Sequence, residues 1–160
     1  MPNAEFKLPV RVGEKPQTGP SMPHLQLSDN SNDESYQALA DWLFSLEHVE
    51  ERPTRVSIPS TRAAWIVESY EAVPPGLNRE FTHIHTEPGP GSQHISLPKE
   101  AASEAVAKGW GEYHPINDQI PDFDLIMVFA PRDIQDLETV KSITMQGYKF
   151  VLGQSSGSSN

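Results

Sequence analysis

The spacing of apolar positions changes along the chain and divides it into helical and extended segments. Apolar residues recur every three or four positions in three segments, which are expected to form helices: residues 31–47, 98–109 and 133–147. Ser31-Asn-Asp-Glu34 is a capping-box pattern that suits the start of the first helix, and Gly109 is placed to end the second. The third helix is expected to begin at Asp133.

Shorter segments either alternate apolar with polar residues, as half-buried strands do, or are continuously apolar. They are expected to form strands at residues 55–58, 62–67, 80–86, 92–97, 110–114, 125–130 and 148–152. Leu125-Ile-Met-Val-Phe-Ala130 is the candidate for a strand buried on both faces. Because strands and helices do not alternate regularly, the sequence predicts an α+β fold, with a mostly antiparallel sheet and about three helices packed on it.

A chain of 160 residues is long enough for a single domain with one core. Residues 1–30 are rich in proline and poor in periodic apolar positions, which predicts an arm that is flexible or lies along the domain surface. Residues 31–153 are expected to form the single α+β domain. Residues 154–160, which are mostly serine and glycine, are expected to be a flexible tail.

Residues 80–97 combine two short alternating segments with a turn rich in proline and glycine at residues 87–91. This pattern predicts a β-hairpin, since prolines and glycines do not continue a central strand. Side chains two positions apart share a face of a strand, so His83 and His85 point the same way. If the turn pairs His85 with His94, three of the six histidines share one face of the hairpin.

Net charge and residue content narrow the class of partner. The formal net charge is −10, with a sequence pI near 4.9, and no basic run is present to neutralise phosphates. This argues against a nucleic-acid or anionic-membrane surface and leaves small molecules or proteins. The chain has no cysteine, no signal-peptide pattern and no apolar run of membrane-spanning length, so the expected location is cytoplasmic. The oligomeric state stays open.

The hairpin histidines support a metal-site hypothesis. His83 and His85 would lie roughly 6–7 Å apart at their Cα atoms, which allows both to bind one metal with His94 from the other strand. Three imidazoles and an open position suit one Zn, Fe or Cu ion, with Glu112 or His114 as a further ligand.

A second hypothesis needs no cofactor. One neutral imidazole can remove a proton while another returns it or stabilises an oxyanion, which suits isomerisation or ring closure. The candidate catalytic residues are His83, His85, His94 and Arg132, the last because it follows the apolar strand. The candidate substrate-binding residues, which offer flat apolar walls and polar groups, are Phe81, Trp65, Trp110, Tyr113, Glu112 and His114. A third hypothesis is structural, with the histidines only hydrogen-bonded within a polar patch.

Several ordered blocks of sequence resemble the luciferase-domain family, a group of short bacterial and fungal proteins whose name does not imply light emission. The blocks are Glu80-Phe-Thr-His-Ile-His85, Gly91-Ser-Gln-His94, Gly109-Trp-Gly-Glu-Tyr-His-Pro115, Met127-Val-Phe-Ala-Pro-Arg-Asp133, Leu137-Glu-Thr-Val140 and Tyr148-Lys-Phe-Val-Leu-Gly153. Thr61-Arg-Ala-Ala-Trp65 is similar to a weaker block upstream. Together the blocks extend over a little more than half of the chain.

The resemblance implies a domain more than a reaction. By analogy with fungal members in secondary metabolism, it favours a cofactor-free isomerase or cyclase acting on a small aromatic or phenolic enone, as in chalcone isomerisation. The alternatives are a metal-dependent enzyme such as an oxygenase and a non-catalytic small-molecule-binding module.

Overall fold

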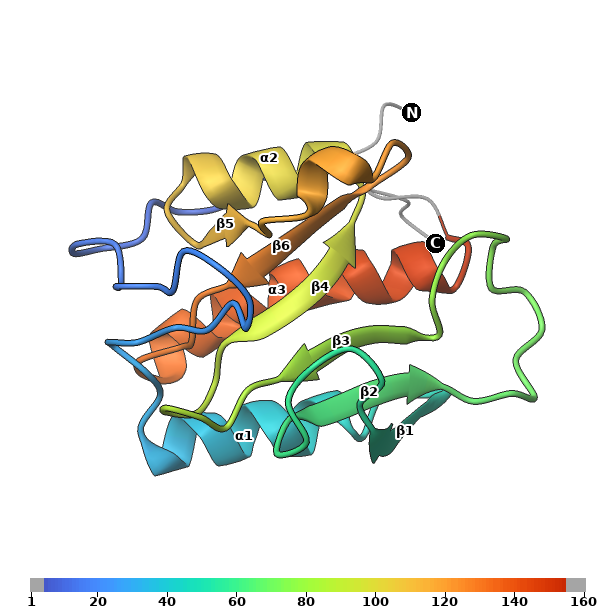
Figure 1. Cartoon of the computed structure of the whole chain (residues 1–160), viewed down its shortest axis with the longest axis horizontal. Helices are drawn as coiled ribbons and strands as arrows, with labels where there is room; N and C mark the ends of the chain where they lie inside the picture. Colours follow the sequence, from blue (N-terminus) through green and yellow to red (C-terminus); the bar gives the residue numbers. More distant parts are fainter. Residues whose placement is uncertain (1–4, 155–160) are drawn as a thin grey trace.

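Six short strands form one sheet in the order β1-β2-β3-β4-β6-β5, and each neighbouring pair is antiparallel. The computed structural model describes residues 5–154 (Figure 1). The strands are β1 (Val49–Pro53), β2 (Arg62–Ile66), β3 (Glu80–Ile84), β4 (Gln93–Leu97), β5 (Gly111–Tyr113) and β6 (Asp124–Val128). The hairpin of β3 and β4 therefore lies in the middle of the sheet.

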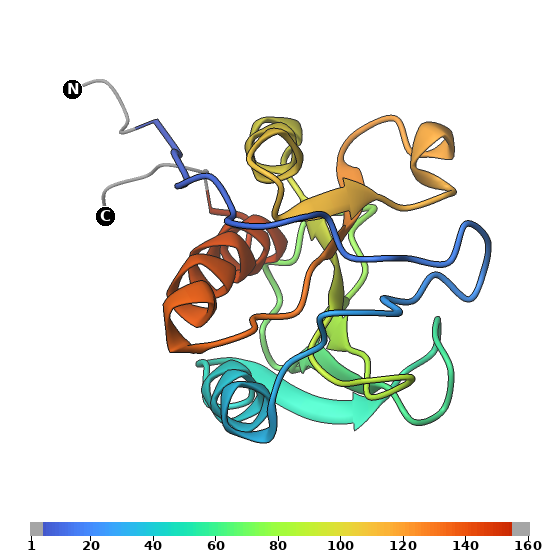
Figure 2. The ribbon, with the colours of Figure 1, turned by 90° about the vertical axis from the view of Figure 1, so that its left-hand side faces the viewer.

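Three α-helices in the described part of the chain cover one face of this sheet, while the arm before α1 crosses the other (Figure 2). The helices are α1 (Asp33–Leu43), α2 (Lys99–Ala107) and α3 (Ile134–Val151), and a 3-10 turn, η1, spans Asn117–Gln119. Apolar side chains of the helices pack against Ile84, Ile95 and Ile126 of the sheet. The predicted α+β fold is confirmed. Within residues 5–154, no helix is both long and apolar enough to cross a membrane.

The first helix begins one residue later than its capping pattern suggests and ends at Leu43, short of the predicted end at Glu47. Asn32 is the N-cap, and its side chain accepts a hydrogen bond from the backbone N–H of Ser35. Ser31 instead donates its hydroxyl proton to the carbonyl oxygen of Pro131. The predicted cap residue thus joins α1 to the end of the β6 segment.

The prediction of a strand at residues 55–58 is wrong. The strand next to β2 is β1, at Val49–Pro53, and residues 55–58 belong to the loop that follows it. Val56 and Ile58 line a cavity above the sheet and do not pair with a strand. The loop is fixed by its backbone, because the N–H of Arg55 donates to the carboxylate of Glu80.

The prediction of a strand at residues 148–152 is also wrong, because α3 continues through Gly147 to Val151. Gly147 is a site of close approach within the helix: a Cβ atom there would lie 2.5 Å from Cδ1 of Ile95. The turn that ends α3 uses Gly153, whose φ of +80° lies in the left-handed region. The predicted start of this helix at Asp133 is confirmed: Asp133 is the N-cap, and its side chain accepts the N–H of Asp136.

The hairpin forms as predicted, but with a different register. His83 pairs with His94, two residues from the assumed pairing of His85 with His94. A shift of two residues keeps every side chain on its face, since strands alternate with period two. His83, His85 and His94 therefore still point to the same side of the sheet, opposite the helices.

Residues 5–30 lie along the domain, held by backbone and side-chain contacts. The N–H of Arg11 donates to the carbonyl of Lys108, and the indole N–H of Trp110 donates to the carbonyl of Pro9. Further along, the side chain of Gln26 accepts the N–H of Ala130. Residues 1–4 of the predicted arm, and residues 155–160 of the predicted tail, lie outside the described residues.

Candidate functional site

The central hairpin brings three buried histidine rings together on the face of the sheet that the helices leave free. His83 and His94 are paired residues of β3 and β4, and their ring centroids lie 5.2 Å apart. His85 follows the end of β3, and its ring lies 4.7 Å from that of His94. All three side chains are at most 6 % exposed. The sequence-predicted group is thus brought together.

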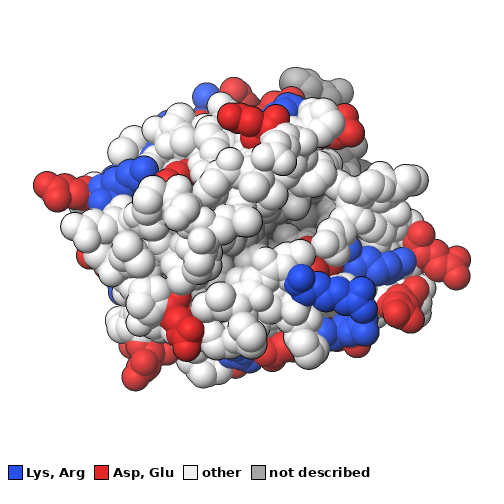
Figure 3. Space-filling model, in the orientation of Figure 1, with Lys and Arg blue, Asp and Glu red and all other residues white. Residues whose placement is uncertain are grey.

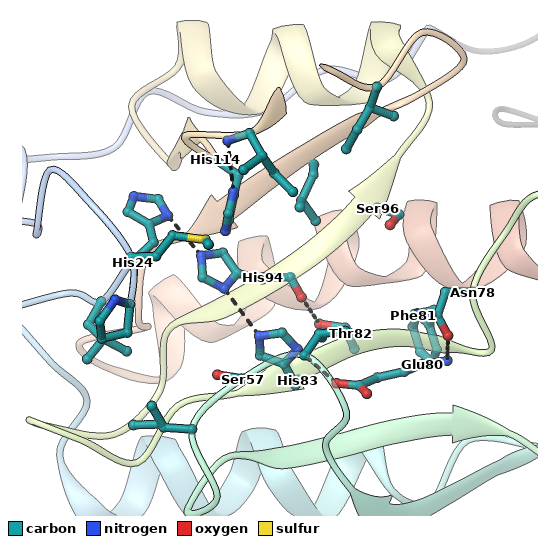
Figure 4. A pocket seen from close by; sticks show the side chains of 18 of the residues that line it. His24, Ser57, Asn78, Glu80, Phe81, Thr82, His83, His94, Ser96 and His114 are labelled. Carbon is teal, nitrogen blue, oxygen red and sulfur yellow. Dashed lines mark hydrogen bonds and ion pairs between the residues drawn. The ribbon is translucent and has the colours of Figure 1, made fainter. Parts of the chain in front are cut away.

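Two more histidines from distant segments complete the cluster (Figure 4). Nδ1 of His24, in the N-terminal arm, lies 2.8 Å from Nε2 of His94. The ring of His114, just after β5, lies 4.7 Å from the ring of His94. We call His24, His83, His85, His94 and His114 the histidine cluster. It holds five of the six histidines of the chain, with His94 at its centre.

A carboxylate stands at each end of the cluster. Oε2 of Glu80 lies 3.1 Å from Nδ1 of His83, and Glu80 also accepts the Thr54 hydroxyl and the Arg55 N–H. Burial alone would raise the pKa of Glu80, but these hydrogen bonds outweigh it and hold the pKa below its usual value. At the other end, Oε1 of Glu112 lies 3.7 Å from Nε2 of His24.

Burial keeps most of the cluster uncharged near neutral pH. Together with the charge on neighbouring histidines, burial lowers the pKa of His85 to about 3 and that of His114 to about 4. Burial is also the main cause that lowers the pKa values of His94 and His24. Neutral imidazoles carry one proton on two nitrogens, so the remaining hydrogen bonds decide which nitrogen is free.

The hydrogen-bond partners of the rings constrain which nitrogens carry a proton. When the Nδ1–H of His83 donates to Glu80 and the ring carries a single proton, its Nε2 is unprotonated, and this nitrogen lies 3.2 Å from Nδ1 of His94. Nδ1 of His85 contacts the hydroxyl of Ser92, whereas its Nε2 is buried without a hydrogen-bond partner. Nε2 of His83 therefore has Nδ1 of His94 as its partner, whereas Nε2 of His85 has none.

The cluster forms the polar part of a cavity of about 810 Å³ on the open face of the sheet. His24, His83, His94 and His114 line it, whereas His85 is not among the lining residues. Apolar side chains form most of its wall: Met22, Pro23, Leu25, Val56, Ile58, Pro59, Phe81, Ile116, Ile120, Phe123 and Leu125. Figure 3 shows the surface hollowed at this place, with mostly uncharged atoms around the opening and basic side chains at its lower right. The size and lining suit a drug-sized, largely apolar ligand.

Not all sequence-predicted site residues reach this cavity. Of the expected aromatic walls, only Phe81 lines it. Trp65 is stacked beneath the guanidinium groups of Arg52 and Arg55, and the indole of Trp110 packs in the core. Tyr113 is 41 % exposed and borders a separate, polar hollow.

Arg132 lies away from the histidine cluster. Its Nε donates to Asp136 over 2.7 Å, and its Nη1 donates to the carbonyl of Val12. It borders a separate cavity of about 380 Å³ that the arm and α3 share. Among the predicted polar groups, His114 lines the main cavity, while Glu112 reaches the cluster through His24.

Sequence reasoning missed two residues of the site, His24 and Glu80. His24 lies in a proline-rich arm where no periodic pattern marks a buried residue. Glu80 and His83 would lie on opposite faces of a regular strand. The register shifts here, because Trp65 pairs with Glu80 whereas Ala64 pairs with Thr82, so β3 accommodates one extra residue. This bulge places Glu80 beside His83.

Two groups of three histidines have ligand atoms within 4.8 Å of one another and so could bind a metal ion. In the group of His83, His85 and His94, Nε2 of His83 contacts Nδ1 of His94, and Nε2 of His85 has no hydrogen-bond partner. In the group of His24, His94 and His114, the N–H of Ile116 donates to Nδ1 of His114. The remaining nitrogen of neutral His114 then carries the proton, which makes this second group the poorer metal site.

Comparison with known proteins gives one match. Residues 78–146 match the family described as Luciferase domain, which confirms the resemblance noted from the sequence. The matched stretch contains Glu80 and four members of the histidine cluster, but not His24. No curated protein and no solved structure matches the chain.

Proposed function

We propose that the luciferase domain of this chain is a small-molecule enzyme that transfers a proton on an aromatic substrate without a cofactor, as an isomerase or cyclase. The observation that carries this proposal is the Glu80–His83 pair at the wall of an apolar cavity. A carboxylate that accepts the Nδ1 proton of a histidine fixes the ring and makes its other nitrogen a proton acceptor. The apolar wall around it suits an aromatic substrate.

The reaction that this arrangement favours is ring closure of a hydroxylated aromatic enone, as in chalcone isomerisation. The phenol replaces His94 as the partner of Nε2 of His83, which takes the phenol proton, and the charge of Glu80 stabilises the imidazolium that forms. The phenoxide oxygen adds to the β-carbon of the enone, a C–O bond forms, and the C=C electrons move to give an enolate. The imidazolium then returns the proton to the α-carbon, so no atom or electron is gained or lost.

The test is turnover of 2′-hydroxychalcone, followed by the loss of its conjugated absorbance. We expect the wild-type protein to accelerate cyclisation and His83→Gln to lose about a hundredfold or more, as is typical for removal of a general base. His48→Asn is the matched control, because His48 lies outside the cluster and contacts Tyr70. A folded His83→Gln variant that keeps full turnover, or a wild-type protein that does not accelerate the reaction, contradicts the proposal.

A metal-dependent enzyme is the second candidate, and a specific observation favours it. Nε2 of His85 is buried without a hydrogen-bond partner, which is costly unless another group satisfies it. A Zn, Fe or Cu ion bound by His83, His85 and His94 would satisfy it. Because His83 and His94 line the cavity, an open coordination position there would face the substrate.

Metal content separates the two candidates. Elemental mass spectrometry is applied to protein purified without added metal, before and after chelation, and to the His83→Ala/His85→Ala double variant. Near-stoichiometric metal that is lost in the variant, together with activity lost on chelation, supports the metal-dependent enzyme. Well-folded protein that turns over the enone without metal supports the cofactor-free reaction.

A further inference from the structure

His114 differs from His83 in the hydrogen bond that fixes its proton. The backbone N–H of Ile116 points at Nδ1 of His114, at 3.1 Å. A backbone N–H can only donate, so Nδ1 of His114 must be unprotonated and the ring proton must sit on Nε2. The same contact is incompatible with a doubly protonated ring. At His83 the acceptor Glu80 places the proton on Nδ1 instead.

The cavity therefore has two histidines with opposite tautomers in its wall, His83 with an unprotonated Nε2 and His114 with an Nε2–H. Within residues 5–154, no side chain or backbone group is hydrogen-bonded to Nε2 of His114. The ring lies next to those of His94 and His24, and its close neighbours Ile116 and Ile120 are apolar wall residues. A donor in such surroundings interacts strongly with an oxygen acceptor.

We propose that His114 is the oxygen-binding residue of the cavity, and that its Nε2–H donates to a carbonyl or enolate oxygen of an otherwise apolar aromatic ligand. The inference deepens the proposed function and rests on it for the identity of the ligand as an aromatic ketone. Arg132, the positively charged residue among the predicted catalytic residues, is held away from the cavity by Asp136. His114 supplies a neutral donor in its place, and it is not a member of the favoured metal-binding group.

Backbone hydrogen bonds around His114 fix the position of its Nε2–H donor. His114 directly follows β5 at the edge of the sheet, and its own N–H donates to the carbonyl of Leu125 on β6. The carbonyl of His114 accepts the N–H of Asn117, which closes the turn before η1. Backbone bonds on both sides thus fix the residue that holds the ring, and Ile116 in the same turn fixes its tautomer.

The first test needs no ligand. Two-bond 1H–15N correlation spectra of the imidazoles distinguish protonated from unprotonated ring nitrogens. At neutral pH we expect the Nε2–H tautomer for His114 and the Nδ1–H tautomer for His83. A His114 ring that carries its proton on Nδ1 overturns the proposal.

The second test compares two ligands that differ by one oxygen: trans-chalcone, which lacks the hydroxyl needed for cyclisation, and 1,3-diphenylpropene, in which the carbonyl is absent. Their dissociation constants are measured by titration calorimetry. We expect the wild-type protein to prefer the ketone about fivefold, the effect of roughly one net hydrogen bond. His114→Phe should abolish this preference without weakening the hydrocarbon, and His114→Gln, which keeps an N–H donor, should retain part of it.

Three results would overturn the proposal. The wild-type protein could bind the two ligands with equal affinity, it could bind neither of them, or the preference for the ketone could survive in His114→Phe. Failure of this binding proposal can be distinguished from failure of the proposed isomerase activity. A protein that binds trans-chalcone through His114 but leaves 2′-hydroxychalcone unchanged would keep the oxygen-binding role and contradict only the isomerase function.

Discussion

Nδ1 of His24 lies 2.8 Å from Nε2 of His94, although 70 residues separate them in the chain. The contact brings the N-terminal arm into the centre of the histidine cluster. Both rings are at most 6 % exposed. Together with Met22, Pro23 and Leu25, His24 also forms one side of the cavity, so the arm is part of the site.

The arm should therefore resist proteolysis as long as the hydrogen bond between Gln26 and Ala130 holds it to the domain. Gln26 accepts the N–H of Ala130 at 2.8 Å and is 1 % exposed. Gln26→Ala leaves that buried N–H without a partner, at a cost of about 1–3 kcal/mol. We expect thermolysin to cleave the His24–Leu25 bond at least fivefold faster in this variant, as measured by mass spectrometry.

Gln17→Ala is the matched control for the arm, because Gln17 belongs to the same segment and its side chain is exposed. Its cleavage rate should equal that of the wild-type protein. Rapid cleavage of the wild-type arm, at a rate that Gln26→Ala does not change, would show that the arm does not depend on this anchor.

Glu80→Gln should lower turnover of 2′-hydroxychalcone without preventing its binding. The amide can donate to Nδ1 of His83, which moves the ring proton to Nε2 and removes the proton acceptor. We expect kcat to fall about a hundredfold or more, with little change in KM, because an incorrect tautomer blocks the base while the cavity stays intact. Steady-state kinetics measure both quantities.

Thr54→Val is the control for this substitution. The hydroxyl of Thr54 donates a hydrogen bond to Glu80. The substitution removes this bond and leaves the bond between Glu80 and His83 in place. Its kcat should stay close to that of the wild-type protein. A Glu80→Gln variant with the same kcat as Thr54→Val would rule out Glu80 as the group that orients His83.

The part of the site that depends on local pattern was predictable from the sequence. Alternation placed His83 and His85 on one face, and a hairpin turn brought His94 to the same face, even though its register was two residues off. His24 was not predictable, because its burial results from a long-range contact of an arm without periodicity. Glu80 was hidden by a bulge that changes which residues share a face.

The same distinction holds for the fold. The third helix begins at Asp133 as predicted, because an N-cap such as Asp133 acts within a few residues. Its predicted end at residue 147 is too early, because Gly147 lies within the helix and allows close contact with β4. Whether a glycine ends a helix or admits a neighbour depends on packing partners that the local sequence does not contain.

Gly147→Ala should destabilise the protein even though alanine favours helices. The added Cβ would lie 2.5 Å from Cδ1 and 2.8 Å from Cγ1 of Ile95, and 3.0 Å from the backbone oxygen of Ser96. Alanine gains about 1 kcal/mol in helix propensity, but overpacking a buried contact costs about 1–3 kcal/mol. We expect a net loss in the free energy of unfolding, measured by urea denaturation.

Gln135→Ala is the comparison in the same helix, at an exposed position of its first turn. It should leave the free energy of unfolding nearly unchanged. An increase in stability of Gly147→Ala would mean that α3 can move away from β4 at little cost.

The pairing of Arg132 with Asp136 should make the protein less stable in acid. Burial by itself would raise the pKa of Asp136, but the hydrogen bonds and charge of Arg132 outweigh it and hold the pKa below the ordinary value of 3.8. A carboxyl whose pKa is lowered in the folded state contributes stability above its unfolded-state pKa and loses it as the pH falls. The wild-type protein should therefore lose this contribution below about pH 4.

Asp136→Asn removes the contribution at every pH. We expect the variant to be less stable than the wild-type protein at pH 7, with a difference that narrows as the pH falls below about 4, in urea denaturation series. The buried histidines also reduce stability in acid, but equally in both proteins, so the difference between them isolates Asp136. Glu138→Gln, at an exposed carboxylate 3.5 Å from Lys141, is the control and should give a nearly constant difference. A gap between wild type and Asp136→Asn that stays constant from pH 7 to pH 3 would show that the Arg132 pair does not lower the pKa of Asp136.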